Sequence, residues 1–325
     1  MKRERLSVSL SSKNNKDYLA VNLPKNLLAE GVVFKSFTLS SQGKFLGKDV
    51  DWNFKDFLHP KLVHKQLDQT HIYTTDFTTT QIFFQKILFF RIPFQVIQYD
   101  TGPNSLCYCF SFFNFIVCIE TSYETRNQNT KVKTKYNIGS LNKLLLNLAF
   151  PLLKIVFTKN YRILMSEDMP LRLRKGQLRS WGFTFKTDTK EKISYHDCNK
   201  ITTKNINFIN KKTEDISKKI KYVYKENKIC SFYIGRSDNF GLRGELRDNK
   251  VFVFPRICNH EGACLDNTDL KGGLISCPWH GKKFKPIFIH DLISGHSFNF
   301  IYSKKNYLLK FYMSKGYEKI NVSIS

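Results

Sequence analysis

The sequence Cys258-Asn-His260, followed after sixteen residues by Cys277-Pro-Trp-His280, decides how the C-terminal part of this chain folds. Each of these two segments supplies one thiolate and one imidazole. Two Cys and two His form the ligand set of a [2Fe–2S] cluster in which the thiolates hold one iron and the imidazoles hold the other. Neutral imidazoles reduce the negative charge of such a cluster and raise its reduction potential. The two segments therefore predict a protein that handles electrons.

A structural zinc is the alternative, because two Cys and two His also form a tetrahedral zinc site. Zinc fingers usually keep their Cys together and their His together, whereas here each segment mixes the two types and is followed by a glycine, Gly262 or Gly281. The stretches Cys258-Asn-His-Glu-Gly-Ala-Cys-Leu and Cys277-Pro-Trp-His-Gly resemble the Rieske iron–sulfur family. The resemblance implies that the cluster ligands are Cys258, His260, Cys277 and His280.

Trp279 indicates which branch of that family the chain is similar to. The membrane-anchored respiratory type carries a disulfide between its two loops, with a Cys at the position of Trp279. Because Trp279 excludes this disulfide, Cys264 has no partner in the other loop, and we interpret it as a small buried side chain. The resemblance is therefore to the soluble ferredoxin and oxygenase type.

Length and composition predict a globular protein of two domains. The chain has 325 residues, 42% of them hydrophobic, which is enough for two cores. Eight Cys in a chain of this length are not a disulfide framework. The N-terminus has no apolar segment typical of a secretory signal. The apolar runs 106–119 and 142–159 are shorter or more interrupted than the roughly 20 apolar residues of a spanning helix. We therefore expect a cytoplasmic protein with no membrane span.

The formal net charge of +25 has several possible explanations. It fits a nucleic-acid binder, a protein on an anionic membrane surface, or one that docks an acidic protein. The basic residues are spread along the chain among Asn, Ile and Phe, which also fits the codon bias of an AT-rich genome. Among the functional explanations, an acidic electron donor is favoured over nucleic acid because the sequence contains no recognised nucleic-acid motif.

The order of the predicted elements is that of an α+β protein. Residues 1–50, including the run that starts at Tyr18, suggest a strand or two and a helix, and residues 70–120 suggest antiparallel strands with a turn at 99–104. Residues 141–175 have helical periodicity, with a break expected near Pro151. Residues 186–219 are polar and resemble a connection. Residues 220–325 are rich in strand patterns, and Val251-Phe-Val-Phe leads into the first ligand segment.

A second group of candidate ligands lies at Asp56-Phe-Leu-His59-Pro-Lys-Leu-Val-His64. The simpler interpretation is a helix start, with His59 as N-cap, Pro60 as the first helical residue and His64 on a solvated face. The pattern Asp-x2-His-x4-His is, however, similar to the mononuclear iron motif of the Rieske oxygenases. The resemblance implies an Fe(II) bound by His59 and His64, with Asp56 as a bridging residue that orients an imidazole.

The resemblance also implies a third, carboxylate ligand on a late helix of the catalytic domain. The pair Glu167-Asp168 lies in the helical stretch about a hundred residues beyond His64. Asp168 is the first choice for this ligand and Glu167 the second. An acidic pair before a proline also commonly forms a solvated helix end, so that interpretation stays open.

Together, the resemblances imply a helix-grip (START/SRPBCC-like) antiparallel sheet with a long helix over residues 1–190, a linker over 191–219 and an all-β Rieske domain over 220–325. Rieske oxygenases usually have the opposite domain order. The implied function is an oxygenase that passes electrons from the [2Fe–2S] cluster to a mononuclear Fe(II), which activates O2 on an apolar organic substrate.

Two other functions remain open. One is a Rieske electron carrier fused to a hydrophobic-ligand-binding module without a second iron. The other, resting only on the charge, is a nucleic-acid-binding redox sensor. The expected partners are a ferredoxin or reductase as electron donor, a small apolar substrate and O2, and possible copies of the chain in a homo-oligomer; nucleic acid is not expected.

Overall fold

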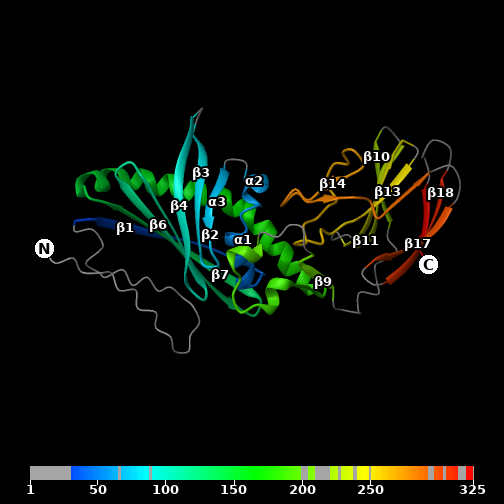
Figure 1. The fold of residues 1–325 in the computed structure, drawn as a ribbon, viewed down its shortest axis with the longest axis horizontal. Coiled ribbons are helices and arrows are strands. Elements are labelled where there is room, and N and C mark those ends of the chain that lie inside the picture. The colour runs from blue at the N-terminus through cyan, green and yellow to red at the C-terminus, as the bar shows by residue number, and fades with distance from the viewer. Residues whose placement is uncertain are drawn as a thin grey trace. The chain divides into compact units, whose positions relative to one another are not determined.

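The computed structural model of this chain describes residues 31–64, 67–87, 90–198, 204–208, 220–225, 228–236, 240–248, 250–291, 296–302, 305–313 and 320–324 (Figure 1). The strand run that begins at Tyr18 lies outside these residues. The chain divides into two compact units. Unit 1 comprises Met1–Asp56, His64–Met169 and Lys192–Cys198, and unit 2 comprises Phe57–Val63, Pro170–Glu191 and Asn199–Ser325. The domain boundaries at residues 190 and 219 stay a prediction.

Unit 1 is built on a seven-stranded antiparallel sheet. Its strand order is β1-β7-β6-β5-β4-β3-β2, so consecutive strands pair from β2 to β7 and β1 closes the far edge against β7. Alternate residues of β7 are buried and exposed, as expected for a sheet with one covered face. The strands are β1 (Val33–Gly43), β2 (Leu67–Thr74), β3 (Thr78–Ile87), β4 (Phe90–Gly102), β5 (Ser105–Phe112), β6 (Phe115–Arg126) and β7 (Asn129–Ser140). The predicted turn between β4 and β5 is confirmed.

The covered face of the sheet packs against the first part of α3 (Lys143–Ser180). Phe115, Val117 and Ile138 from the sheet form a buried cluster with Leu146 of the helix, and Phe157 packs against them. A long helix on an antiparallel sheet is the helix-grip arrangement, so the predicted α+β fold class is confirmed.

The predicted break of the helix near Pro151 is wrong, because α3 is one helix of 38 residues. An interior proline costs about 3 kcal/mol because it removes a backbone hydrogen bond. Aromatic packing holds the helix on both sides of it: Phe150 meets Phe37 of β1 with ring centroids 6.1 Å apart, and Phe157 meets Tyr136 of β7 at 5.5 Å. Phe37, Phe150 and Phe157 are partly buried. Full burial of such a side chain contributes about 1.5–3 kcal/mol, so their partial burial offsets part of the cost of the proline.

The described part of unit 1 also contains two short helices. The helix α1 (Gly47–Lys55) follows β1 directly, and α4 (Tyr195–Cys198) contacts it. Val50 of α1 packs with Phe45, Tyr123 and Val132 in a second buried cluster. No helix within the described residues is long and apolar enough to cross a membrane.

Unit 2 contains the C-terminal strands. Its largest sheet has the order β10-β11-β12-β13-β16, and β13 runs into the first cluster loop as predicted. Those strands are β10 (Ile220–Lys225), β11 (Lys228–Arg236), β12 (Phe240–Arg247), β13 (Lys250–Pro255) and β16 (Phe288–Asp291). The remaining strands are the pair β14 (Ile275–Ser276) and β15 (Lys283–Phe284) and the sheet of β17 (His296–Tyr302), β18 (Lys305–Met313) and β19 (Ile320–Ile324).

Unit 2 also includes short elements that lie before β2 or between α3 and β10 in the sequence. They are α2 (Pro60–Val63), β8 (Phe183–Phe185), the 3-10 helix η2 (Lys186–Thr189) and β9 (Ile206–Phe208), which pairs with β8. The described part of 220–325 contains strands, turns and loops, so the predicted all-β region is confirmed.

Candidate metal centres

The two loops that carry the predicted cluster ligands have the same backbone hydrogen bonds. In the first loop, the Gly262 amide donates to the Cys258 carbonyl at 2.9 Å, and the Cys258 amide donates to the Ala263 carbonyl at 2.8 Å. In the second loop, the Gly281 amide donates to the Cys277 carbonyl at 2.9 Å, and the Cys277 amide donates to the Lys282 carbonyl at 2.8 Å. Both glycines have positive φ, +87° and +66°, which explains why a glycine follows each ligand pair.

Each cysteine of these loops accepts hydrogen bonds from the backbone two and three residues further on. His260 and Glu261 donate to the Cys258 sulfur, and Trp279 and His280 donate to the Cys277 sulfur. Burial raises the pKa of Cys258, but the Cys277 thiol and these amides lower it to about 7. The hydrogen bond to the Cys258 sulfur and, after it, burial raise the pKa of Cys277.

The four predicted cluster ligands are buried together in unit 2. Cys258 and His260 are 0% exposed, Cys277 is 2% and His280 is 5% exposed. The two imidazole rings lie 4.8 Å apart in an edge-to-face arrangement. Two thiols and two imidazoles from matching loops, with amides directed at the sulfurs, fit the donor set of the [2Fe–2S] cluster. The structure brings all four predicted ligands together in these loops.

Side chains from the last turns of α3 hold the first cluster loop in place. Lys175 and Glu261 form a buried ion pair at 2.6 Å, with side chains 0% and 1% exposed. Asn205 donates to the other Glu261 oxygen at 2.9 Å, and Arg174 donates to the Gly262 carbonyl at 3.3 Å. Because Glu261 follows the predicted ligand His260, these contacts fix the backbone that carries the imidazole.

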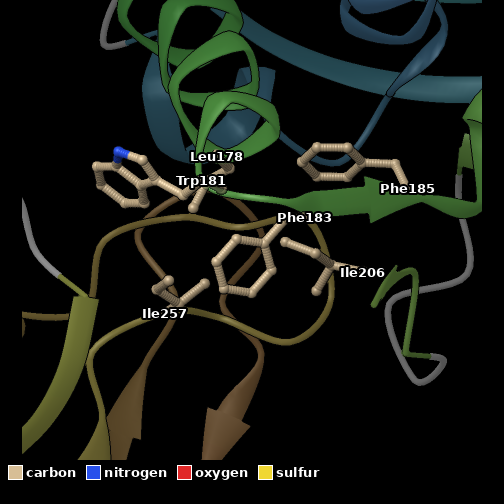
Figure 2. Close-up of a cluster of buried hydrophobic side chains, with 6 residues drawn as sticks. All are labelled: Leu178, Trp181, Phe183, Phe185, Ile206 and Ile257. Atoms are coloured by element: carbon tan, nitrogen blue, oxygen red, sulfur yellow. The ribbon is translucent and has the colours of Figure 1, made fainter. Parts of the chain in front are cut away.

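An apolar cluster of unit 2 supports the same loop (Figure 2). Ile257, the residue before the predicted ligand Cys258, packs there against residues of α3, β8 and β9. The members of this cluster are Leu178, Trp181, Phe183, Phe185, Ile206 and Ile257. The ligand loop therefore rests on side chains from segments that are up to about 80 residues away in the sequence.

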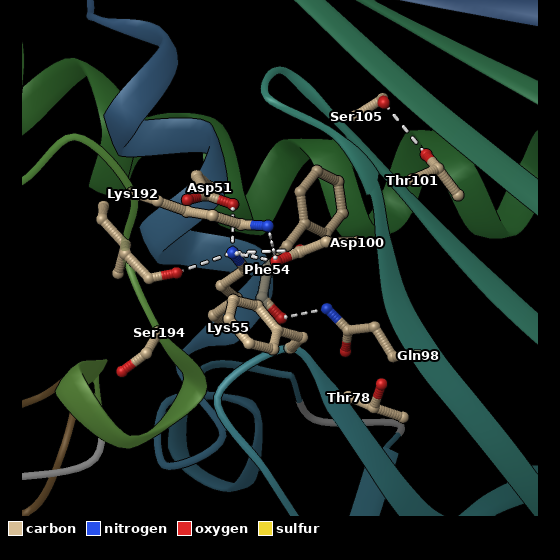
Figure 3. A network of polar contacts seen from close by, with 12 residues as sticks. Asp51, Phe54, Lys55, Thr78, Gln98, Asp100, Thr101, Ser105, Lys192 and Ser194 are labelled. Carbon is tan, nitrogen blue, oxygen red and sulfur yellow. Dashed lines mark hydrogen bonds and ion pairs between the residues drawn. The ribbon is translucent and has the colours of Figure 1, made fainter. Parts of the chain in front are cut away.

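The second group of predicted ligands begins directly after an anchored helix end. Lys55, the last residue of α1, is fully buried, and its ammonium group contacts Asp51 at 2.9 Å, Asp100 at 3.0 Å and the Ile193 carbonyl at 2.7 Å (Figure 3). Lys192 adds a second cation to Asp100 at 2.8 Å. An ammonium group has three donors, so the three contacts of Lys55 satisfy its hydrogen-bonding capacity. They also fix the start of the segment that carries Asp56, His59 and His64.

The segment after α1 forms one turn of helix between the two predicted histidine ligands. The amides of Leu62 and Val63 donate to the His59 carbonyl at 2.9 and 2.8 Å, and Pro60 is the first helical residue. The helix-start interpretation is thus correct for the backbone. It does not conflict with a ligand role, because both imidazoles are buried, His59 at 3% and His64 at 6% exposure.

Within unit 1, His64 meets both carboxylates of the Glu167-Asp168 pair on different ring atoms. Its Nδ1 lies 2.8 Å from Glu167 Oε2, and its Nε2 lies 3.3 Å from Asp168 Oδ1. Asn53 of α1 donates to Asp168 Oδ1 at 3.2 Å. In the tautomer that carries its proton on Nδ1, His64 would donate to Glu167 and direct the Nε2 lone pair at Asp168. Two atoms that bind one metal at right angles lie about 3 Å apart, close to the Nε2–Oδ1 distance.

The potential ligand atoms of His59, His64 and Asp168 all lie within 4.8 Å of one another. Two imidazoles and one carboxylate are the donor set that holds non-haem Fe(II) with open coordination positions. Asp56 is buried, at 1% exposure, and its amide donates to the Trp52 carbonyl at the end of α1. Its role as a bridge stays a prediction.

Two supporting residues, Asn53 and Lys175, were not identified from the sequence. Asn53 precedes Asp56 by three residues, which is about one helical turn. This spacing was the signal that could have identified it. Glu167 was considered only as an alternative ligand, whereas here it contacts the Nδ1 of His64. Lys175 is one of 52 basic residues, and no sequence signal separates it from the others.

Comparison with known proteins identifies the C-terminal part. Residues 219–288, which include all four predicted cluster ligands, match the family model of the Rieske [2Fe-2S] domain, so the resemblance stated from the sequence is confirmed there. The presence of this domain implies a [2Fe–2S] cluster. No curated protein matches the chain.

Several solved structures are similar to parts of the chain. TTHA0849 from Thermus thermophilus has 10% sequence identity and a TM-score of 0.36, covering 41% of this chain and 94% of its own. The Zhui aromatase/cyclase from a Streptomyces species has 10% identity and a TM-score of 0.37, with coverages of 46% and 96%. The quaternary ammonium Rieske monooxygenase CntA has 17% identity and a TM-score of 0.33, with coverages of 52% and 47%.

Proposed function

We propose that this protein is a Rieske-type non-haem iron oxygenase, in which the cluster held by the 258–280 loops supplies electrons to an Fe(II) held by His59, His64 and Asp168. The observation that carries the proposal is the convergence of these three side chains within 4.8 Å. The sequence pattern alone also fits a solvated helix start, which would not place two buried imidazoles beside a buried carboxylate.

The residues around this group have distinct roles in the proposal. Glu167 holds the proton of His64 on Nδ1, so that Nε2 is available as a ligand. Asn53 donates to Asp168 and keeps one carboxylate oxygen in place. An Fe(II) bound there supplies open positions for O2 and for a substrate. Asp56 is assigned the bridging role between the two centres, and a ferredoxin or reductase is the proposed electron donor.

Metal content tests the proposal most directly. Purified under anaerobic conditions, the protein should contain about three irons and two sulfides per chain, two of the irons in the cluster. His59→Ala, His64→Ala and Asp168→Ala should each lower the iron content to about two. The EPR signal of the reduced cluster should stay unchanged, because the four cluster ligands are not touched.

His196→Ala is the matched control for these variants. His196 also lies beside a carboxylate, with Nδ1 3.1 Å from Asp76 Oδ1, but both side chains are exposed. This variant should keep about three irons. If the parent protein contains only two irons and the three ligand variants change nothing, the protein is instead an electron carrier fused to a ligand-binding module. A reduced protein without a Rieske-type EPR signal contradicts both functions.

A further inference from the structure

The outer face of α3 in unit 1 carries a row of exposed apolar side chains. Leu144, Leu148, Leu152 and Ile155 are 69%, 72%, 64% and 66% exposed, and Leu141, just before the helix, is 72% exposed. Spacings of three and four residues place them on one helix face. We call Leu141, Leu144, Leu148, Leu152 and Ile155 the outer stripe.

The outer stripe is separate from the helix face that packs on the sheet. Leu146, Leu153 and Phe157 contact the buried cluster of unit 1. At about 100° per residue, these positions are rotated by roughly 100–180° around the helix from Leu148 and Leu152. Within the described part of the chain, the helix therefore buries one apolar face and presents a second one to solvent. A row of large apolar residues on the surface marks an interaction site.

The charges around the outer stripe have one sign. Residues 141–166 contain four basic residues and no Asp or Glu. The four are exposed: Lys143, Lys154, Lys159 and Arg162. Lys159 lies one turn beyond Ile155, and Arg162 lies three residues further, so the apolar row continues into cationic side chains on the same face.

We propose that the outer stripe docks this protein on the surface of an anionic phospholipid bilayer, with α3 lying in the plane of the interface. A helix with Leu and Ile on one face and Lys and Arg beside them binds in this way, through buried apolar area and attraction to anionic headgroups. The net charge of +25 acts in the same direction. The helix rests on the bilayer and does not cross it, in agreement with its hydropathy.

The charge pattern favours a bilayer over a second copy of the chain. A symmetric dimer through this face would bring the same residues of both copies together. Lys159 and Arg162, which lie on this face, would then find no carboxylate to pair with in the 141–166 segment. An anionic bilayer provides both the apolar layer and the opposite charge.

Vesicle flotation of the full protein tests this proposal. Binding is expected to phosphatidylcholine vesicles that contain phosphatidylglycerol, to weaken with added salt, and to be much weaker with phosphatidylcholine alone. Leu148→Gln combined with Leu152→Gln should reduce binding at least about tenfold, because both side chains lose their transfer into the apolar layer. Lys159→Gln combined with Arg162→Gln should reduce it about fivefold for each charge removed.

Matched controls keep the same type of change on another surface of unit 1. Ile97→Gln with Ile116→Gln replaces two apolar side chains of the sheet that are each 42% exposed. Lys131→Gln with Lys133→Gln removes two exposed charges from β7. Both control pairs should bind vesicles like the parent protein, apart from a small effect of the net charge.

Three results would overturn the proposal. The first is no binding to the anionic vesicles. The second is equal binding by the stripe variants and their controls. The third is light scattering that shows a dimer which Leu148→Gln with Leu152→Gln dissociates, since the stripe would then join two copies. None of these outcomes depends on the iron content, so the test is independent of the proposed oxygenase activity.

Discussion

Replacing Gly262 by alanine should disturb the first cluster loop through one identifiable contact. Gly262 has a φ of +87°, and a Cβ built on it would lie within van der Waals overlap of Leu178 Cδ1. Leu178 is 0% exposed and packs in the cluster that supports this loop, so it has no free space to move into. The substitution therefore adds both backbone strain and a steric conflict.

The expected loss of stability follows from these two effects. A non-glycine residue with positive φ costs about 1–2 kcal/mol. Extra volume in a packed core costs about 1–3 kcal/mol more. Gly262→Ala should therefore destabilise unit 2 by about 2–5 kcal/mol. Gly272→Ala is the matched control, because Gly272 has a φ of +57° and nothing lies within 4 Å of its added Cβ; it should cost only about 1–2 kcal/mol.

A double-mutant cycle separates the steric part from the backbone part. Urea denaturation would be measured for Gly262→Ala, for Leu178→Ala and for the double variant, with cluster absorbance as a second readout. Once Leu178 is shortened, the added Cβ has space, so the two changes should be non-additive by about 1–3 kcal/mol. Additive losses, or a Gly262→Ala variant no less stable than Gly272→Ala, would refute the assignment of this contact.

Three further substitutions test other contacts. Lys55→Met removes the cation that contacts Asp51 and one of the two cations that contact Asp100, and should cost about 3–5 kcal/mol in chemical denaturation; a loss below about 1 kcal/mol would contradict the buried network. Burial raises the pKa of the Asp188 carboxyl, but Arg179 lowers it more, so that it lies below its ordinary value. The ionised carboxylate therefore stabilises the fold above the ordinary carboxyl pKa, and this contribution is lost as the pH falls through the lowered pKa. Asp188→Asn should cost about 1.5–3 kcal/mol at neutral pH and much less in acid, measured by urea denaturation across pH; a pH-independent difference would argue against it. Glu167→Gln should weaken Fe(II) binding about 10–100-fold in anaerobic titration without abolishing it, because Glu167 acts through His64; loss of all binding would instead make Glu167 a ligand.

The cluster loops were predictable because their chemistry is local in the sequence. Cys258 and His260 are two residues apart, and each ligand pair precedes a glycine whose positive φ closes the loop. The sheet and helix were predictable from hydrophobic periodicity for the same reason. These signals depend on neighbours within a few residues.

Features that depend on distant residues could not be predicted in this way. The continuity of α3 through Pro151 depends on Phe37 and Tyr136. These residues come from β1 and β7, which are the first and last strands of the sheet along the chain. The sequence identified Asp168 and Glu167 as candidates for the carboxylate ligand. Only the three-dimensional structure shows that Glu167 contacts Nδ1 of His64 and Asp168 contacts Nε2. Lys55 is identical in type to dozens of surface residues, and burial alone separates it from them.

The matching backbone bonds of the two cluster loops have an electrochemical consequence. The amides of His260, Glu261, Trp279 and His280 donate to the Cys258 and Cys277 sulfurs from the main chain, so these hydrogen bonds do not depend on which side chains the four residues carry. Exchanging one ligand imidazole for a thiolate would then alter the charge on the cluster, and hence its reduction potential, while the loop keeps its shape. A single substitution at a ligand position can therefore change the reduction potential of the cluster while the loop keeps its conformation.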